Sequence, residues 1–524
     1  MKKELFILCI VVAILGASCK KDLDQVPIST ATTETFYKQP SDFVQAVNAT
    51  YNALRGSSDG TIQGYPDRLL ALSEVRSDNI YPSNAVARDA DPINNFAPGI
   101  AANTYVEQGW NAGFSGIFKA NTVIDQITKN GTYVGSAALA TRLMAEARFL
   151  RAFFYFDLVR YYGKLPIVTH PVLTAEADTI RRSAVADVYA LIISDLQFAI
   201  ANLPAAYNGT YPAYATTDVG RATKYAAEAI LGEVYMTRSG PTYGIDGPGL
   251  GLSEWNLAVP LFNDIINSTF FVFNPSFTNI FSYTNQSPAY TSGNREAIFD
   301  VMYISGQNPI LGATFPWGLV PNTYFSSLSG NTVANGQLGF PGVSNDLLNS
   351  FAATDTRKSP TIHTSAFTTS GSTDAHPFYR KYLDTTKIPT NSRFDWGINF
   401  IAIRYTDILM LKAECVLRGA TGSQAADVDA VVNQVRARAG QTAIAGVTLS
   451  QLLDERRREF AGEGSRWFDL QRSGNLLTIM NNWMATEDAA QHKMNPVTKD
   501  YIIYPVPQSQ LDAQPGLYTQ NPAY

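Results

Sequence analysis

The sequence has few charged residues and few cysteines for its length. Charged side chains make up 16% of the 524 residues, against roughly 25% in an ordinary globular protein. Acidic residues outnumber basic ones by 45 to 40, and there is no long basic run. A chain of this kind cannot neutralise a phosphate backbone, so no nucleic-acid partner is expected. With only three cysteines, a disulfide framework is excluded.

Motifs for metal, cofactor or nucleophile chemistry are also scarce. The four histidines, His170, His363, His376 and His492, do not form an HExxH or a similar metal-binding spacing. The chain contains no Walker loop, no GxGxxG and no GxSxG nucleophile elbow. We therefore expect no metal, no cofactor and no catalytic residue.

Aromatic residues, in contrast, are plentiful. They make up 12% of the chain, with 27 Tyr and 28 Phe. This is enough apolar material for a large core, which excludes wholesale disorder.

The first residues have the pattern of a secretion signal. Lys2 and Lys3 precede an apolar run from Leu5 to Leu15, and small residues then lead to Cys19. The run is shorter than the ~20 residues that a membrane-spanning helix needs. A cysteine directly after the small residues resembles the bacterial lipoprotein signal, which predicts cleavage after residue 18 and lipidation of Cys19. The alternative is a conventional signal peptide in which Cys19 is incidental.

The mature chain reads as one mostly α-helical body. Residues 19–40 form a polar tether, and no later segment is apolar enough to span a membrane. Spacings of three and four between apolar residues predict a helical scaffold over 41–267 and 401–472, with one apolar stripe on the helix after Ser136. Residues 268–400 read as a loop-rich part with short strands, and 473–524 as an extension whose tail lies on the surface as extended chain. Helices are expected at 41–54, 105–127, 137–162, 183–202, 223–238, 253–267, 403–418, 425–439, 450–460 and 465–472, and strands at 270–273 and 297–303.

Successive antiparallel helix pairs predict a tetratricopeptide-like stack, in which each pair buries one face against the next. Since no 34-residue consensus repeats literally, an irregular helical domain is the alternative.

The densest polar cluster lies at residues 454–469. One interpretation is a glycoside hydrolase that uses Glu459 with Glu463, or Glu463 with Asp469. Arginines lie within one helical turn of these acids, however, and ion pairing keeps carboxylates ionised, whereas a general acid needs a raised pKa. A structural role is therefore favoured for the whole motif, which comprises Arg457, Glu459, Phe460, Gly462, Glu463, Arg466, Trp467 and Asp469.

Two loop regions are rich in aromatic and amide side chains. Sugars present flat apolar faces and a rim of hydroxyls, so a sugar site needs exposed rings together with Asp, Asn or Arg. Composition alone nominates eight ligand-binding candidates: Asp78, Asn79, Tyr81, Asn84, Tyr283, Tyr290, Trp317 and Tyr324.

Several long segments resemble a known family. "RRREFAGEGSRWFDLQR" (456–472) is similar to the C-terminal signature of the SusD/RagB family of Bacteroidetes outer-membrane lipoproteins. "AEARFLRAFFYFDLVRYYGKLPIV" (145–168) resembles a central helix motif of that family. Three further segments match in the same order: 220–236, 403–419 and 432–440.

The resemblance implies a tetratricopeptide-like helical fold displayed on the outer membrane and assembled with a SusC-like TonB-dependent transporter. It also implies capture of an oligosaccharide, or in some members a peptide, without catalysis. The shared motifs belong to the scaffold and transfer no ligand residue. The hypotheses from the sequence are thus a lipid-anchored glycan binder at the cell surface, a RagB-like peptide binder, a glycoside hydrolase and a purely structural adaptor for the transporter.

Overall fold

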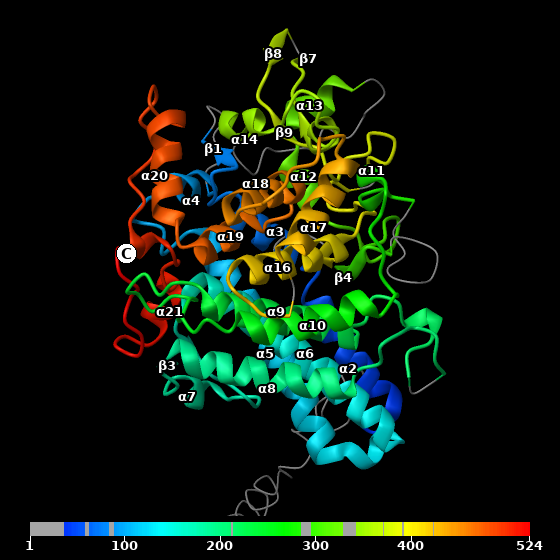
Figure 1. Cartoon of the computed structure of the whole chain (residues 1–524). Coiled ribbons are helices and arrows are strands. Elements are labelled where there is room, and N and C mark those ends of the chain that lie inside the picture. The colour runs from blue at the N-terminus through cyan, green and yellow to red at the C-terminus, as the bar shows by residue number, and fades with distance from the viewer. Residues whose placement is uncertain are drawn as a thin grey trace, which may run out of the picture.

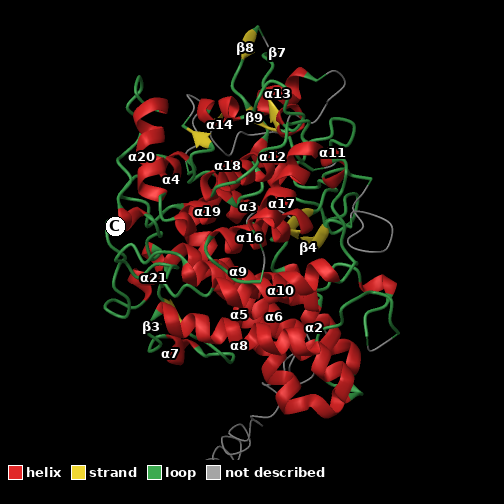
Figure 2. Ribbon diagram, viewed as in Figure 1, coloured by secondary structure: helices red, strands yellow, loops and turns green. Residues whose placement is uncertain are grey.

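The computed structural model describes residues 36–57, 62–82, 89–210, 213–284, 295–328, 342–369, 371–389, 392–422 and 424–524. Cys19, Asn84 and Tyr290 lie outside these ranges. The described chain is mostly helical, with a few short strands at its edges (Figure 2). The prediction of a mostly α-helical fold is confirmed.

A stack of helices forms the centre of the molecule (Figure 1). α5 (Thr104–Asn130) packs on α6 (Ala137–Tyr162), which packs on α8 (Val185–Asn202), and α8 in turn packs on α9 (Lys224–Ser239). The stack continues through α10 (Trp255–Asn267), α16 (Tyr405–Leu417) and α17 (Ala425–Arg438). This neighbour-to-neighbour packing is the tetratricopeptide-like arrangement expected from the sequence.

Helix α6 begins and ends where its sequence predicts. The Ser136 hydroxyl accepts a hydrogen bond from the Leu139 amide at 3.1 Å and caps the first turn. Gly163 ends the helix at φ +71°, a conformation that glycine adopts most readily. The expectation of a single apolar stripe is wrong for the C-terminal half, where every side chain but one from Ala145 to Tyr162 is buried. α6 is the central helix, covered by α5 on one side and α8 on the other.

Of the described helices, only α8 is long and apolar enough to meet the criteria for a membrane span. It packs between α6 and α9, as a core helix does.

The remaining helices flank this stack. α18 (Leu449–Phe460) and α19 (Arg466–Ser473) pack across the end of the scaffold, and α20 (Leu476–Glu487) follows. The shorter helices are α2 (Pro40–Asn52), α3 (Tyr65–Leu69), the π-helix η1 (Leu70–Glu74), α4 (Asp91–Asn94), η2 (Gly131–Val134), α7 (Thr174–Ala177), η3 (Thr216–Asp218), α11 (Phe277–Ile280), α12 (Phe315–Leu319), α13 (Asn322–Ser327), α14 (Asn345–Ser350), α15 (Lys358–Thr361), η4 (Lys499–Tyr501) and α21 (Gln508–Ala513).

The strands of the described ranges form five antiparallel pairs. β4 (Ala297–Val301) pairs with β10 (Phe400–Arg404) and joins the loop-rich part to the scaffold at the start of α16. The short pairs are β1 (Ile80–Tyr81) with β5 (Gly342–Val343), β2 (Leu165–Pro166) with β3 (Arg182–Ser183), β6 (Ile362–His363) with β9 (Phe378–Tyr379), and β7 (Phe367–Thr369) with β8 (Ser372–Asp374).

Two further expectations are wrong, one of them only in part. Residues 270–273 form no strand, because their backbone runs as a loop beside Arg295, whose guanidinium donates to the Phe270 carbonyl. The tail lies on the surface only from residue 508 onward, where it begins with the short helix α21. Its residues 502–506 are buried, and the Tyr504 hydroxyl donates to the Leu72 carbonyl at 2.8 Å. The first part of the tail therefore belongs to the core.

Candidate functional site

Tyr81 lies at one end of the molecule, where β1, β5, α13, α14 and the β7–β8 hairpin gather (Figure 1). It lines a pocket of about 200 Å³ together with His376, Glu487 and Lys493. Its hydroxyl donates to Asp488, and burial followed by this hydrogen bond raises the Tyr81 pKa. The phenol therefore stays neutral at the wall of a polar pocket.

Asp78 and Asn79, which immediately precede Tyr81, are buried in the scaffold. Asp78 forms a two-pronged ion pair with Arg466, with both N–O distances at 2.8 Å. Burial alone would raise the pKa of Asp78, but Arg457 and Arg466 outweigh it and lower the pKa to about 2. Asn79 accepts a hydrogen bond from Arg457 at 2.8 Å. Both side chains therefore hold the loop to the scaffold and are not available to a surface ligand.

Tyr324 lies in an aromatic cluster behind this pocket. It is 8% exposed, and its ring contacts those of His363, Phe367 and Phe378 at centroid distances of 4.8–5.3 Å. Residue 377 lines the Tyr81 pocket and precedes Phe378. Tyr324 thus supports the wall of that pocket rather than facing a ligand itself.

Trp317 and Tyr283 belong to a neighbouring group of aromatic residues. The half-buried Trp317 ring lies 4.6 Å from the Arg393 guanidinium and 5.4 Å from the Phe394 ring. The Tyr283 hydroxyl donates to the Tyr382 carbonyl at 3.1 Å. Tyr382 packs on Phe315, at the start of the helix that carries Trp317. The described candidates therefore form two groups, one around Tyr81 and one around Trp317.

The cluster predicted at 454–469 forms the ionic centre of the scaffold. Arg404, at the end of β10, contacts Glu296, Glu459 and Glu463, each at 2.9 Å. Arg357 and Arg438 also pair with Glu459, and Lys381 pairs with Glu463 at 2.7 Å. The Phe460 ring lies 4.0 Å from the Arg404 guanidinium. These groups join six separate segments of the chain, around residues 296, 357, 381, 404, 438 and 459–463.

A second ionic group continues the first along α19. Arg456 pairs with Asp469 at 2.9 Å, and Arg472 pairs with both Asp469 and Glu414. Trp467, on the same helix, is completely buried. Gly462 and Gly464 turn the chain between α18 and α19, and their amides donate to Glu74 of η1. The motif therefore fixes the corner between the two helices.

The electrostatics of these acids oppose a role as general acid. Burial alone would raise the pKa values of Glu459, Glu463 and Asp469, but the neighbouring arginines outweigh it and hold all three below their ordinary range. A general acid for glycoside cleavage needs the opposite shift. The arrangement supports the structural interpretation over hydrolysis. Within the described ranges, no three His, Cys, Asp or Glu side chains are placed to hold a metal ion.

Comparison with known proteins agrees with this architecture. A family model described as "Starch-binding associating with outer membrane" matches residues 26–236, and one described as "SusD family" matches residues 368–524. SusD-like protein P2 of Formosa agariphila is 25% identical over the whole length of both chains. The SusD-like protein of Bacteroides ovatus is 24% identical, over 90% of this chain and 82% of its own. The chain belongs to the SusD-like family.

Solved structures show the same fold as this SusD-like chain. Surface glycan-binding protein A from Bacteroides uniformis superposes with a TM-score of 0.76 at 24% identity, covering 92% of this chain and 100% of its own. The protein of that name from Bacteroides thetaiotaomicron, in complex with laminarihexaose, has a TM-score of 0.74 at 22% identity, with 93% and 100% covered. The five family-like segments of the sequence all lie inside the two ranges that match family models.

Several residues of this SusD-like protein could not be assigned from sequence patterns. Arg357, Lys381 and Arg404 lie far from residues 456–472 along the chain, and only the fold brings them to Glu459 and Glu463. Arg393 stacks on Trp317 after a similarly long separation.

Proposed function

We propose that this protein is a lipid-anchored, non-catalytic glycan-binding protein of the cell surface, which delivers an oligosaccharide to a SusC-like TonB-dependent transporter. The observation that carries the proposal is full-length similarity to SusD-like proteins, together with a half-buried tryptophan flanked by an arginine. Two structural neighbours support the ligand class, because one is named for laminarin binding and another was solved with laminarihexaose.

Trp317 is the residue best suited to stack on a sugar ring. The Arg393 guanidinium lies over one face of the indole, and the Phe394 ring meets the indole edge-on. A half-buried ring fixed in this way can stack with its other face on the apolar face of a pyranose. Tyr81 and His376 in the neighbouring pocket extend the surface for a longer chain.

Replacing Trp317 by alanine is therefore expected to weaken glycan binding at least tenfold, since truncation of a tryptophan at the centre of a binding surface costs about 2 kcal/mol or more. The measurement is calorimetric titration of the purified protein with laminarihexaose and with maltohexaose. Tyr133→Ala is the matched control, because Tyr133 is an exposed aromatic residue of η2.

The outcomes separate the four hypotheses. If the wild type binds neither sugar but binds peptides from a casein digest, the peptide hypothesis replaces the glycan hypothesis. Release of reducing ends, abolished by Glu463→Gln, would instead support a hydrolase. Failure to bind any of these ligands, with unchanged uptake by cells carrying Trp317→Ala, would favour the structural adaptor.

The lipid anchor gives a separate prediction. Cys19→Ser is expected to move the protein from the outer-membrane fraction to the soluble fraction, because the acyl chains supply the membrane affinity, at about 0.8 kcal/mol per buried CH₂. Fractionation of cells followed by immunoblotting measures this. A Cys415→Ser variant is the control, since Cys415 is buried within α16. Unchanged membrane association of the Cys19→Ser protein would contradict the anchor.

A further inference from the structure

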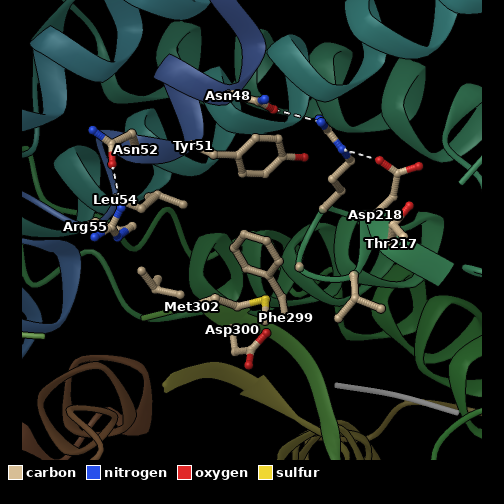
Figure 3. Close-up of a pocket in the computed structure, with 14 residues that line it drawn as sticks. Asn48, Tyr51, Asn52, Leu54, Arg55, Thr217, Asp218, Phe299, Asp300 and Met302 are labelled. Carbon is tan, nitrogen blue, oxygen red and sulfur yellow. Dashed lines mark hydrogen bonds and ion pairs between the residues drawn. The ribbon is translucent and has the colours of Figure 1, made fainter. Parts of the chain in front are cut away.

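A second hollow of the molecule lies between α2, residues 217–221 and the end of β4 (Figure 3). Its volume is about 310 Å³, at the small end of the roughly 300–1,000 Å³ typical of small-molecule sites. None of the eight sugar-binding candidates lines it. The pocket is therefore separate from the proposed glycan surface, and its size limits it to one small molecule.

One side of this pocket is fixed by Arg221. Its guanidinium contacts Glu146 at 2.9 Å. It also contacts Asp218 at 3.0 Å and Asn48 at 2.7 Å, and both of these side chains are labelled in Figure 3. Gly220 has φ +98°, and a Cβ there would come within 2.3 Å of the Met302 sulfur. The positive φ favours glycine at this position, since L side chains rarely adopt that backbone conformation. The wall is thus preorganised, and the charge of Arg221 is already balanced by two carboxylates.

Arg55 is the basic group of the pocket that has no partner of opposite charge among the described residues. It donates to Asn52 at 3.0 Å, and its guanidinium lies 5.7 Å from the Tyr303 ring, but it pairs with no carboxylate of the described chain. Asp300, in contrast, is buried and accepts a hydrogen bond from Asn399 at 2.8 Å. Arg55 is therefore the group of this pocket that can pair with an anionic ligand.

The rest of the lining has two kinds of surface. Leu54, Val219 and Met302 offer apolar contact, while Asn48, Asn52 and Thr217 offer amide and hydroxyl groups. A ligand that fits must therefore combine apolar C–H surface, several hydroxyls and one anionic group to pair with Arg55.

We propose that this pocket binds one small hydroxylated carboxylate with the chemistry of a hexuronic acid. Its carboxylate pairs with Arg55, and its hydroxyls bond to Asn48 and Asn52. A planar guanidinium matches a carboxylate with two parallel hydrogen bonds, so the acid is preferred over the neutral sugar of the same size.

Calorimetric or saturation-transfer NMR titration of the purified protein tests this with D-glucuronate, D-galacturonate and D-mannuronate as probes. At least one is expected to bind saturably, and at least tenfold more tightly than D-glucose. Arg55→Gln is expected to weaken that binding at least tenfold. Thr217→Trp, at an exposed position of the rim, is expected to block it without disturbing the core.

Arg181→Gln is the matched control, because Arg181 is exposed and does not line the pocket. The proposal is overturned if no hexuronate binds, if glucose binds equally well, or if Arg55→Gln and Thr217→Trp both bind like the wild type. The Trp317→Ala protein is expected to keep hexuronate binding, so the two sites are distinguished from each other.

Discussion

Replacing Arg404 by alanine is expected to lower the free energy of unfolding by at least about 3 kcal/mol, and to leave little folded protein at growth temperature. Removing one partner of a buried ion pair typically costs about 3–5 kcal/mol, because the remaining charge stays buried without compensation. Arg404 contacts three carboxylates, those of Glu296, Glu459 and Glu463, and its side chain is 2% exposed. Urea unfolding followed by circular dichroism measures the change.

The size of the loss in unfolding free energy depends on which basic partners each glutamate keeps after Arg404 is removed. Without Arg404, the basic partner of Glu463 that remains among the described residues is Lys381 at 2.7 Å, while Glu459 still has Arg357 and Arg438. Arg404→Lys keeps the charge but loses the fork that reaches both oxygens of Glu463, so it is expected to fall between the wild type and alanine.

Arg181→Ala is the control for the loss of an arginine, because Arg181 is exposed and is expected to change the unfolding free energy by less than about 0.5 kcal/mol. An Arg404→Ala protein that unfolds within about 1 kcal/mol of the wild type would show that the network is not needed for stability. The structural interpretation of the 456–472 motif would then lose its physical basis.

The helical scaffold could be predicted from sequence because its signals are local. Apolar residues three and four apart, with Ser136 and Thr223 as caps, define α6 and α9 within one or two residues. The tail 502–506 could not be placed in the core, because its burial depends on partners such as Leu72 and Tyr161, far away in the chain. The same limit applies to α6, whose polar side chains read as solvent-facing.

The candidate site shows the same difference between what local sequence signals and what distant contacts determine. Composition indicated that Trp317 and Tyr81 lie in loops suited to sugar binding. It also nominated Asp78 and Asn79, because carboxylates and amides are also common in sugar sites, but these two side chains are buried. What distinguishes them is Arg457 and Arg466, which reach back to this loop across the fold. The pocket around Arg55 had no sequence signal, because three distant segments form it.

The free energy of unfolding is also expected to depend on pH through Asp300. Burial raises the pKa of this carboxyl to about 7, and the hydrogen bond from Asn399 only partly offsets the shift. In the unfolded chain the ordinary value is about 3.9. Between these two values the folded protein holds a proton that the unfolded chain has released. This contribution to stability is complete below about pH 4 and is lost as the pH rises through 7.

Asp300→Asn replaces the titrating carboxyl by an amide. The amide oxygen can still accept the hydrogen bond from Asn399. One pKa unit corresponds to about 1.4 kcal/mol, so the stability of the variant relative to the wild type is expected to rise by about 2–4 kcal/mol between pH 5 and pH 8. Other titrating groups are common to both proteins and cancel in the difference. Urea unfolding of both at the two pH values measures it. A difference that stays constant within about 0.5 kcal/mol would mean that Asp300 is ionised throughout, with its buried oxygen satisfied by a partner such as water.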